Sequence, residues 1–201
     1  NVLYWGYDED DFKGLPANRP AEKEVSQKNE TVILHAGNLF AYQNPKHFWK
    51  QIKDKNDSGS NFKIRFIGTV DPIVLDYLKE IGLLDKVETL GFLPYHEMIK
   101  QIYEADILLV CASEPRHVPG KLFEALRTGN PIIAFGDDNS EVKQIIESAN
   151  SGMMYGYNDP CQNFFNDFEK IKPDLTLIKI FDRALISKKF FEIIKDLHHK
   201  G

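Results

Sequence analysis

The feature that most constrains this chain is a series of short apolar segments that alternate with amphipathic segments of helical length. The expected strands cover residues 31–36, 63–67, 87–90, 106–112 and 131–135, and the expected helices cover residues 45–53, 71–81, 95–104, 119–128 and 140–149. Strands that are apolar throughout and separated by helices indicate a parallel sheet covered on both faces. Because crossover connections are right-handed, the pattern predicts an α/β fold with a doubly wound parallel sheet of Rossmann type.

Four glycines mark one edge of this predicted sheet. Gly37, Gly68, Gly91 and Gly136 each follow the end of an expected strand. In such sheets ligands bind outside the carboxyl ends of the strands. Any one of these glycines is also explained by a tight turn between a strand and a helix. As a set they predict which edge carries the functional site.

The ends of the chain differ from this repeating middle. Residues 1–30 are rich in Asp, Glu, Lys, Pro and Asn and are expected to form a linker segment, with a short strand at residues 2–5. Residues 31–175 would form the α/β domain, and residues 176–201 would hold a C-terminal helix over residues 182–197. Residues 54–61 have the composition of a loop. The C-terminal helix is strongly apolar, and it would dock on its own domain or on a second domain.

Composition excludes several classes of function. The net charge is −5, whereas nucleic-acid binding requires a basic face, so no nucleic-acid partner is expected. No segment has the roughly 18 apolar residues that span a bilayer, and no signal peptide is visible. The two cysteines are unpaired in the sequence, which fits a reducing cytoplasm. No His, Cys, Asp or Glu cluster has the spacing of a metal site, so no metal is expected.

The chain begins without Met, and we expect it to be part of a longer protein.

The most informative stretch is residues 119–134, where a loop leads into a helix at the predicted ligand edge. The exposed N–H groups at a helix N-terminus attract phosphate. Pro119 suits the first helical position, Gly120 would let an anion approach the backbone, and Lys121 adds a positive charge. Helical spacing places Glu124 on the face of Gly120 and Lys121, away from an apolar face formed by Leu122, Phe123 and Leu126. Glu124 would accept hydrogen bonds from two ribose hydroxyls, or would pair with Arg127 or Thr128.

This stretch resembles the "GKLFEYLAAGKPIIA" signature of the group 1 (family 4) glycosyltransferases, which are retaining enzymes of the GT-B fold. Residues 6–12 are similar to the "NGYDxxDF" linker that leads into the C-terminal domain of that family. Residues 34–39, 66–68, 90–95 and 105–109 resemble its strand ends in the same order. The resemblance implies that the chain is the C-terminal, nucleotide-sugar-binding half of a GT-B fold.

The resemblance also implies roles for matched positions. Glu124 would bind the ribose of the donor, and Lys121 with the backbone of Pro119 and Gly120 would hold the diphosphate. Gly37 and Asn38 would face the phosphates, and Gly91 and Phe92 would border the base. The substrate would be a nucleotide-diphosphate sugar, with no separate cofactor and no metal.

The same resemblance implies a cellular context. The partner would be an N-terminal acceptor domain of the same protein, so the fragment alone would be nearly inactive. The family context implies synthesis of surface polysaccharide, in the cytoplasm or peripheral to the inner membrane. Any membrane contact would be made by the other half.

The chain departs from the family pattern at positions that concern catalysis. The family motif is Glu-x7-Glu, but Arg116 stands eight positions before Glu124. Asn38 and Gln43 occupy positions where many relatives carry cations. Lys121 and Arg116 are the candidate catalytic residues, because they would stabilise the anionic leaving group. A non-catalytic nucleotide-sugar-binding module and another GT-B enzyme, such as a nucleotide-sugar 2-epimerase, remain alternatives. A dinucleotide-binding domain is a weaker one, since no G-x-G-x-x-G follows a strand.

Overall fold

A computed structural model describes residues 2–15 and 30–198, so residues 16–29 of the expected linker lie outside the described residues. Six strands form one sheet in the order β3-β2-β1-β4-β5-β6, and all neighbouring pairs are parallel. This is the strand order of a Rossmann-like fold and confirms the predicted fold class. The strands are β1 (Thr31–Ala36), β2 (Phe62–Ile67), β3 (Val87–Thr89), β4 (Ile107–Cys111), β5 (Ile132–Phe135) and β6 (Gly152–Tyr155).

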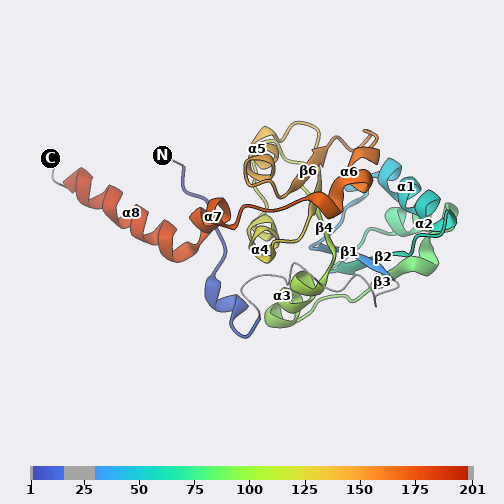
Figure 1. The fold of residues 1–201 in the computed structure, drawn as a ribbon, viewed down its shortest axis with the longest axis horizontal. Helices are drawn as coiled ribbons and strands as arrows, with labels where there is room; N and C mark the ends of the chain where they lie inside the picture. The colour runs from blue at the N-terminus through green and yellow to red at the C-terminus, as the bar shows by residue number, and fades with distance from the viewer. Residues whose placement is uncertain (1, 16–29, 199–201) are drawn as a thin grey trace.

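Helices cover both faces of the sheet (Figure 1). Helices α3, α4 and α5 bury apolar residues against one face, and α1, α2 and α6 against the other. The helices are α1 (Lys46–Asp57), α2 (Pro72–Glu80), α3 (Tyr95–Glu104), α4 (Gly120–Thr128), α5 (Ser140–Ser148), α6 (Gln162–Asp167), α7 (Leu175–Ile178) and α8 (Arg183–His198). Of the linker, Glu9–Phe12 form a 3₁₀ helix, η1.

Strand β4 shows why the sheet has two hydrophobic cores. All five of its residues are buried, and alternate side chains enter opposite cores. Leu108 and Val110 belong to the core beside α3, α4 and α5, while Ile107, Leu109 and Cys111 belong to the other. A strand with period two must be apolar throughout when both faces are covered. This central strand leads directly into the loop and helix α4 of the predicted site.

The structure corrects four local expectations. Residues 2–5 are not a strand: Tyr4 packs its ring against Phe123, and Trp5 is exposed. Helix α1 continues to Asp57, so only residues 58–61 of the expected loop lie outside it. The sequence suggests Ser140 as the N-cap of the helix expected at residues 140–149, but Asn139 caps α5, because its side chain accepts a hydrogen bond from the amide of Val142. The sequence reasoning also missed the edge strand β6.

Helix α8 agrees with the expected boundaries within one residue, but much of its apolar surface does not dock on its own domain. It projects away from the body of the domain (Figure 1). Phe190, Phe191 and Leu197 are 51%, 59% and 68% exposed, so these three side chains do not pack on the domain. No helix in the described part of the chain is long and apolar enough to cross a membrane.

Candidate functional site

Helix α4 begins next to the carboxyl ends of the strands, as expected, but one residue later. Pro119 has an extended backbone, with φ −60° and ψ 131°, and forms the N-cap position, so Gly120 is the first helical residue. Gly120 is exposed, and Leu122 and Leu126 are fully buried against the sheet. The first amide groups of the helix therefore stand at an open surface, where an anion can approach them.

The loop before α4 is held by a side chain that the sequence reasoning did not associate with it. The Asn139 amide donates hydrogen bonds to the backbone oxygens of Glu114 (2.7 Å) and His117 (2.9 Å). Asn139 is 3% exposed and also caps α5, so one buried amide joins that helix to the loop. Arg116 lies on this loop, is exposed, and has no polar side-chain contact among the described residues.

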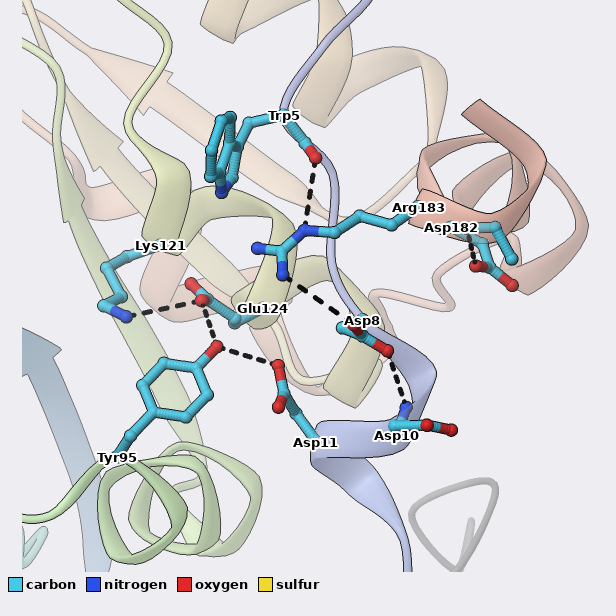
Figure 2. A network of polar contacts seen from close by, with 10 residues as sticks. Trp5, Asp8, Asp10, Asp11, Tyr95, Lys121, Glu124, Asp182 and Arg183 are labelled. Carbon is cyan, nitrogen blue, oxygen red and sulfur yellow. Dashed lines mark hydrogen bonds and ion pairs between the residues drawn. The ribbon is translucent and has the colours of Figure 1, made fainter. Parts of the chain in front are cut away.

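Glu124 is the most unusual polar residue of the site. It is 4% exposed, yet it lies in the cleft rather than in the core. Its Oε1 atom accepts hydrogen bonds from the Tyr95 hydroxyl (2.8 Å) and from Lys121 Nζ (3.3 Å), as Figure 2 shows. Its Oε2 atom is buried and has no partner within the described residues. A buried carboxylate oxygen without a donor is costly, so this atom marks a place where a ligand can bind.

The expected alternative partners of Glu124 are engaged elsewhere. Arg127 binds the carboxylate of Glu9 in η1, and the Thr128 hydroxyl donates to the backbone oxygen of Ala125 (2.7 Å). Within α4, Glu124 therefore forms its ion pair with Lys121. The Lys121 side chain is 37% exposed and that of Glu124 is 5% exposed.

Tyr95, the first residue of α3, contacts both Glu124 and Lys121 of α4. Lys121 Nζ lies 4.8 Å from the centre of its ring, which is a cation–π arrangement. Its hydroxyl also contacts Asp11 Oδ2 of η1, at 3.0 Å. Burial and the nearby carboxylates of Glu124 and Asp11 raise the pKa of Tyr95 well above its usual value, so the phenol keeps its proton.

These side chains line one cleft of about 540 Å³. Four of its lining residues were not predicted from the sequence: Asp11 and Tyr95, described above, together with Trp5 of the linker and Arg183 of α8. The Arg183 guanidinium lies 5.4 Å from the Trp5 ring centre, and its Nε donates to the Trp5 carbonyl at 3.4 Å. The cleft thus combines two cations, two carboxylates and two aromatic rings. The full lining is Trp5, Asp11, Tyr95, Gly120, Lys121, Glu124 and Arg183.

The other predicted residues lie in turns at the carboxyl ends of the strands and do not line this cleft. The amide of Gly37 donates to Ile67 O (2.8 Å), and that of Gly68 donates to Gly91 O (2.7 Å), so adjacent turns are joined. Asn38 Oδ1 accepts a hydrogen bond from the Thr69 hydroxyl (2.8 Å), so the Asn38 side chain has a structural partner in the next turn. Phe92, in contrast, is 76% exposed. The structure therefore brings Gly120, Lys121 and Glu124 together but places Gly37, Asn38, Gly91, Phe92, Pro119 and Arg116 outside their cleft.

One further buried polar group lies below the Gly37 turn. His35 Nδ1 donates to Leu109 O at 3.0 Å, and its Nε2 has no hydrogen-bond partner in the described structure. Burial lowers the pKa of His35, so the ring is neutral. Within residues 2–15 and 30–198, no group of three or more His, Cys, Asp or Glu side chains could hold a metal ion.

The sheet order, the open N-terminus of α4 and the buried carboxylate define the class as a Rossmann-like domain with a polar ligand cleft. The family model described as glycosyl transferases group 1 matches residues 18–162. The chain belongs to the group 1 glycosyl transferases. It is also 29% identical over 147 residues to an uncharacterized glycosyltransferase of Haemophilus influenzae, a match that covers 72% of this chain and 39% of the relative.

Solved glycosyltransferase structures of the GT-B fold are similar to this chain. A glycosyltransferase from Rickettsia africae has a TM-score of 0.73 at 19% identity and is matched over 100% of this chain and 58% of its own. Anabaena HepE in complex with UDP has a TM-score of 0.73 at 16% identity, over 98% and 57%. The lipopolysaccharide outer core galactosyltransferase WaaB has a TM-score of 0.70 at 18% identity, over 98% and 55%. At these identities the likeness shows the fold, and the chain spans less than two thirds of each relative.

Proposed function

We propose that this chain is the donor-binding half of a retaining glycosyltransferase, with a nucleotide-diphosphate sugar as its substrate. The observation that carries the proposal is the unpartnered Oε2 atom of Glu124, buried in a cleft that also contains Gly120 and Lys121. A carboxylate suits the hydroxyls of a ribose, and a helix N-terminus with an adjacent lysine suits a diphosphate. The complex of HepE with UDP supports this substrate class.

In the proposed reaction the nucleoside diphosphate leaves as an anion. The amides at the start of α4 and the ammonium group of Lys121 would stabilise that charge, because oriented donors in a cleft are effective against developing charge. Arg116, exposed on the preceding loop, would add a second cation after a movement of its side chain. Lys121 binds Glu124, so the diphosphate would have to compete with that carboxylate for its ammonium group.

The acceptor site belongs, in this proposal, to an N-terminal domain of the same protein. The chain spans 39% of the curated relative and 58% or less of the three solved structures reported above, which leaves room for such a domain. The exposed apolar face of α8 would pack on it, since Phe190, Phe191 and Leu197 have no cover on this domain. The similarity to WaaB, a lipopolysaccharide outer core galactosyltransferase, supports a proposed role in surface polysaccharide synthesis.

A second candidate function is a binding module without transferase activity. It is favoured by Arg116, which stands where the family motif has the glutamate that contacts the donor sugar. The full-length protein would then bind the donor but neither transfer nor hydrolyse the sugar. Turnover of a radiolabelled donor by the full-length protein separates the two functions.

The first test is calorimetric titration of the chain with UDP, GDP, ADP and NAD. We expect one nucleoside diphosphate to bind best and Glu124→Ala to weaken it by about tenfold to a hundredfold, because hydrogen bonds to a charged group contribute roughly 1.5–3 kcal/mol. Glu147→Ala on α5 is the matched control, since its carboxylate is half exposed and lies outside the cleft. Equal binding of all four ligands, or no effect of Glu124→Ala, would overturn the assignment.

A further inference from the structure

The two oxygens of Glu124 have very different surroundings. Oε1 accepts from both Tyr95 (2.8 Å) and Lys121 (3.3 Å), whereas Oε2 accepts from no group among the described residues. A vicinal diol donates two hydrogen bonds and needs two acceptors. Because Oε1 is already engaged twice, Oε2 is the carboxylate oxygen that can accept from one hydroxyl, and a neighbouring oxygen at the cleft can accept from the other.

The Tyr95 hydroxyl oxygen is the neighbour with spare acceptor capacity. A phenol has a single proton, and this one lies between Glu124 Oε1 at 2.8 Å and Asp11 Oδ2 at 3.0 Å. Donation to Glu124 leaves the lone pairs of the Tyr95 oxygen unused and facing Asp11, which as a carboxylate cannot donate to them. A hydroxyl group of a ligand in the cleft can donate to one of these lone pairs.

The position of Tyr95 fits a binding residue better than a purely structural one. The residue is 43% exposed, its side chain lines the cleft, and its ring faces Lys121 Nζ at 4.8 Å. In Figure 2 the Tyr95 hydroxyl and the Glu124 carboxylate point toward each other from α3 and α4. The Tyr95 hydroxyl and the Glu124 carboxylate therefore reach the same cleft from two different helices.

We propose that Tyr95 is a specificity-determining residue of the donor site: its hydroxyl oxygen and Glu124 Oε2 together recognise the two hydroxyls of the donor ribose. This inference rests on the proposed function, since it requires a nucleoside diphosphate in the cleft. It predicts selection for ribonucleotides, because a deoxy ligand leaves one of the two acceptors without a donor. Asp11 would support the pair from the linker by holding the tyrosine in place.

The test compares the best-binding nucleoside diphosphate among UDP, GDP and ADP with its 2′-deoxy and 3′-deoxy forms. Dissociation constants are measured for the unaltered chain, Tyr95→Phe, and the matched control Tyr77→Phe, whose hydroxyl contacts Lys46 O (3.4 Å) on the other face of the sheet. Each variant keeps its ring and loses one oxygen, and thermal unfolding checks that it folds. We expect Tyr95→Phe to weaken the ribonucleotide by about threefold to tenfold, the effect of one neutral hydrogen bond.

The decisive readout is the ratio between ribo and deoxy forms. In Tyr95→Phe the preference over one deoxy form should fall to near unity, while the preference over the other form stays, since Glu124 still binds that hydroxyl. Tyr77→Phe should leave both ratios unchanged. If both ratios survive in Tyr95→Phe while Glu124→Ala abolishes binding, the inference about Tyr95 is wrong and the proposed function stands. If the unaltered chain binds no nucleoside diphosphate, both are overturned.

Discussion

The contact between Glu9 and Arg127 attaches the linker to helix α4, and its removal should measurably destabilise the chain. Arg127 Nε donates to Glu9 Oε2 at 2.6 Å, and its Nη2 binds the other carboxylate oxygen. The Arg127 side chain is 11% exposed and its guanidinium lies 5.0 Å from the Phe12 ring centre, whereas Glu9 is 52% exposed. The change Glu9→Gln keeps the size of the side chain and removes its charge.

The expected loss follows from these exposures. Hydrogen bonds to charged groups contribute about 1.5–3 kcal/mol when they are shielded. Because Glu9 is half exposed, water screens part of this interaction, and we expect a loss of about 2 kcal/mol in the free energy of unfolding. For a chain of this size that corresponds to a decrease of roughly 4–8 °C in Tm.

The loss should depend on pH in a defined direction. The hydrogen bond from Arg127 lowers the pKa of Glu9. A carboxyl group whose pKa is lower in the folded state stabilises the fold above its unfolded pKa, and this contribution disappears as pH falls through the folded pKa. The difference between the unaltered chain and Glu9→Gln should therefore be full at pH 7, begin to fall near the usual glutamate pKa of about 4.3, and vanish only below the lowered pKa of the folded state.

The assay is urea unfolding at pH 7 and at acidic pH, with Asp10→Asn as the control. Asp10 lies in the same η1 helix, but its pair with Lys13 has side-chain exposures of 73% and 75%, so this change should cost under about 0.5 kcal/mol. A Glu9→Gln variant as stable as Asp10→Asn at pH 7, or a loss that persists unchanged at acidic pH, would refute the reasoning.

Three further changes test other parts of the structure. Lys121→Met should weaken nucleoside diphosphate binding by about tenfold, because it removes a charge-assisted contact, and calorimetry at two salt concentrations would show a reduced salt dependence; unchanged affinity would exclude a role in binding the diphosphate. Asn139→Ala should lower the free energy of unfolding by about 2 kcal/mol in urea, since it leaves the loop oxygens without a donor and removes the cap of α5. A loss under about 0.5 kcal/mol would contradict this account. Gly152→Ala should prevent stable folding, because its Cβ would lie 1.8 Å from a backbone oxygen of β5; a soluble variant with the thermal stability of the unaltered chain would show that this packing is misdescribed.

The sequence predicted the parts of the fold that local chemistry decides. Five strands were found because each has a clear end, and because β1, β4 and β5 are made mostly of buried apolar residues. The sixth, Gly152–Tyr155, has no β-branched residue and is only half buried at the sheet edge, so the usual pattern was missing. Residues 2–5, in contrast, were predicted to form a strand and do not. They have strand composition, but the burial of the Tyr4 ring against Phe123 decides their path.

The candidate site was predictable only where its residues are close in sequence. Gly120, Lys121 and Glu124 share one face of one helix, so helical spacing was sufficient to group them. Tyr95 and Asp11 are 84 positions apart, and their contact depends on how η1 packs against α3, which no local pattern records. The burial of Glu124 and its unpartnered oxygen also depend on that packing.

The linker is therefore part of the candidate donor site rather than a passive connection to it. The short helix η1 carries Glu9, which binds Arg127 of α4, and Asp11, which contacts Tyr95 of α3. The first contact is to α4, which carries Lys121 and Glu124. The second is to α3, which carries Tyr95, the residue that contacts both of them. A displacement of η1 would break an ion pair and free the Tyr95 hydroxyl from its second carboxylate in the same movement. Any change in the path of the linker is thus expected to alter the affinity of the cleft for its ligand as well as the stability of the domain.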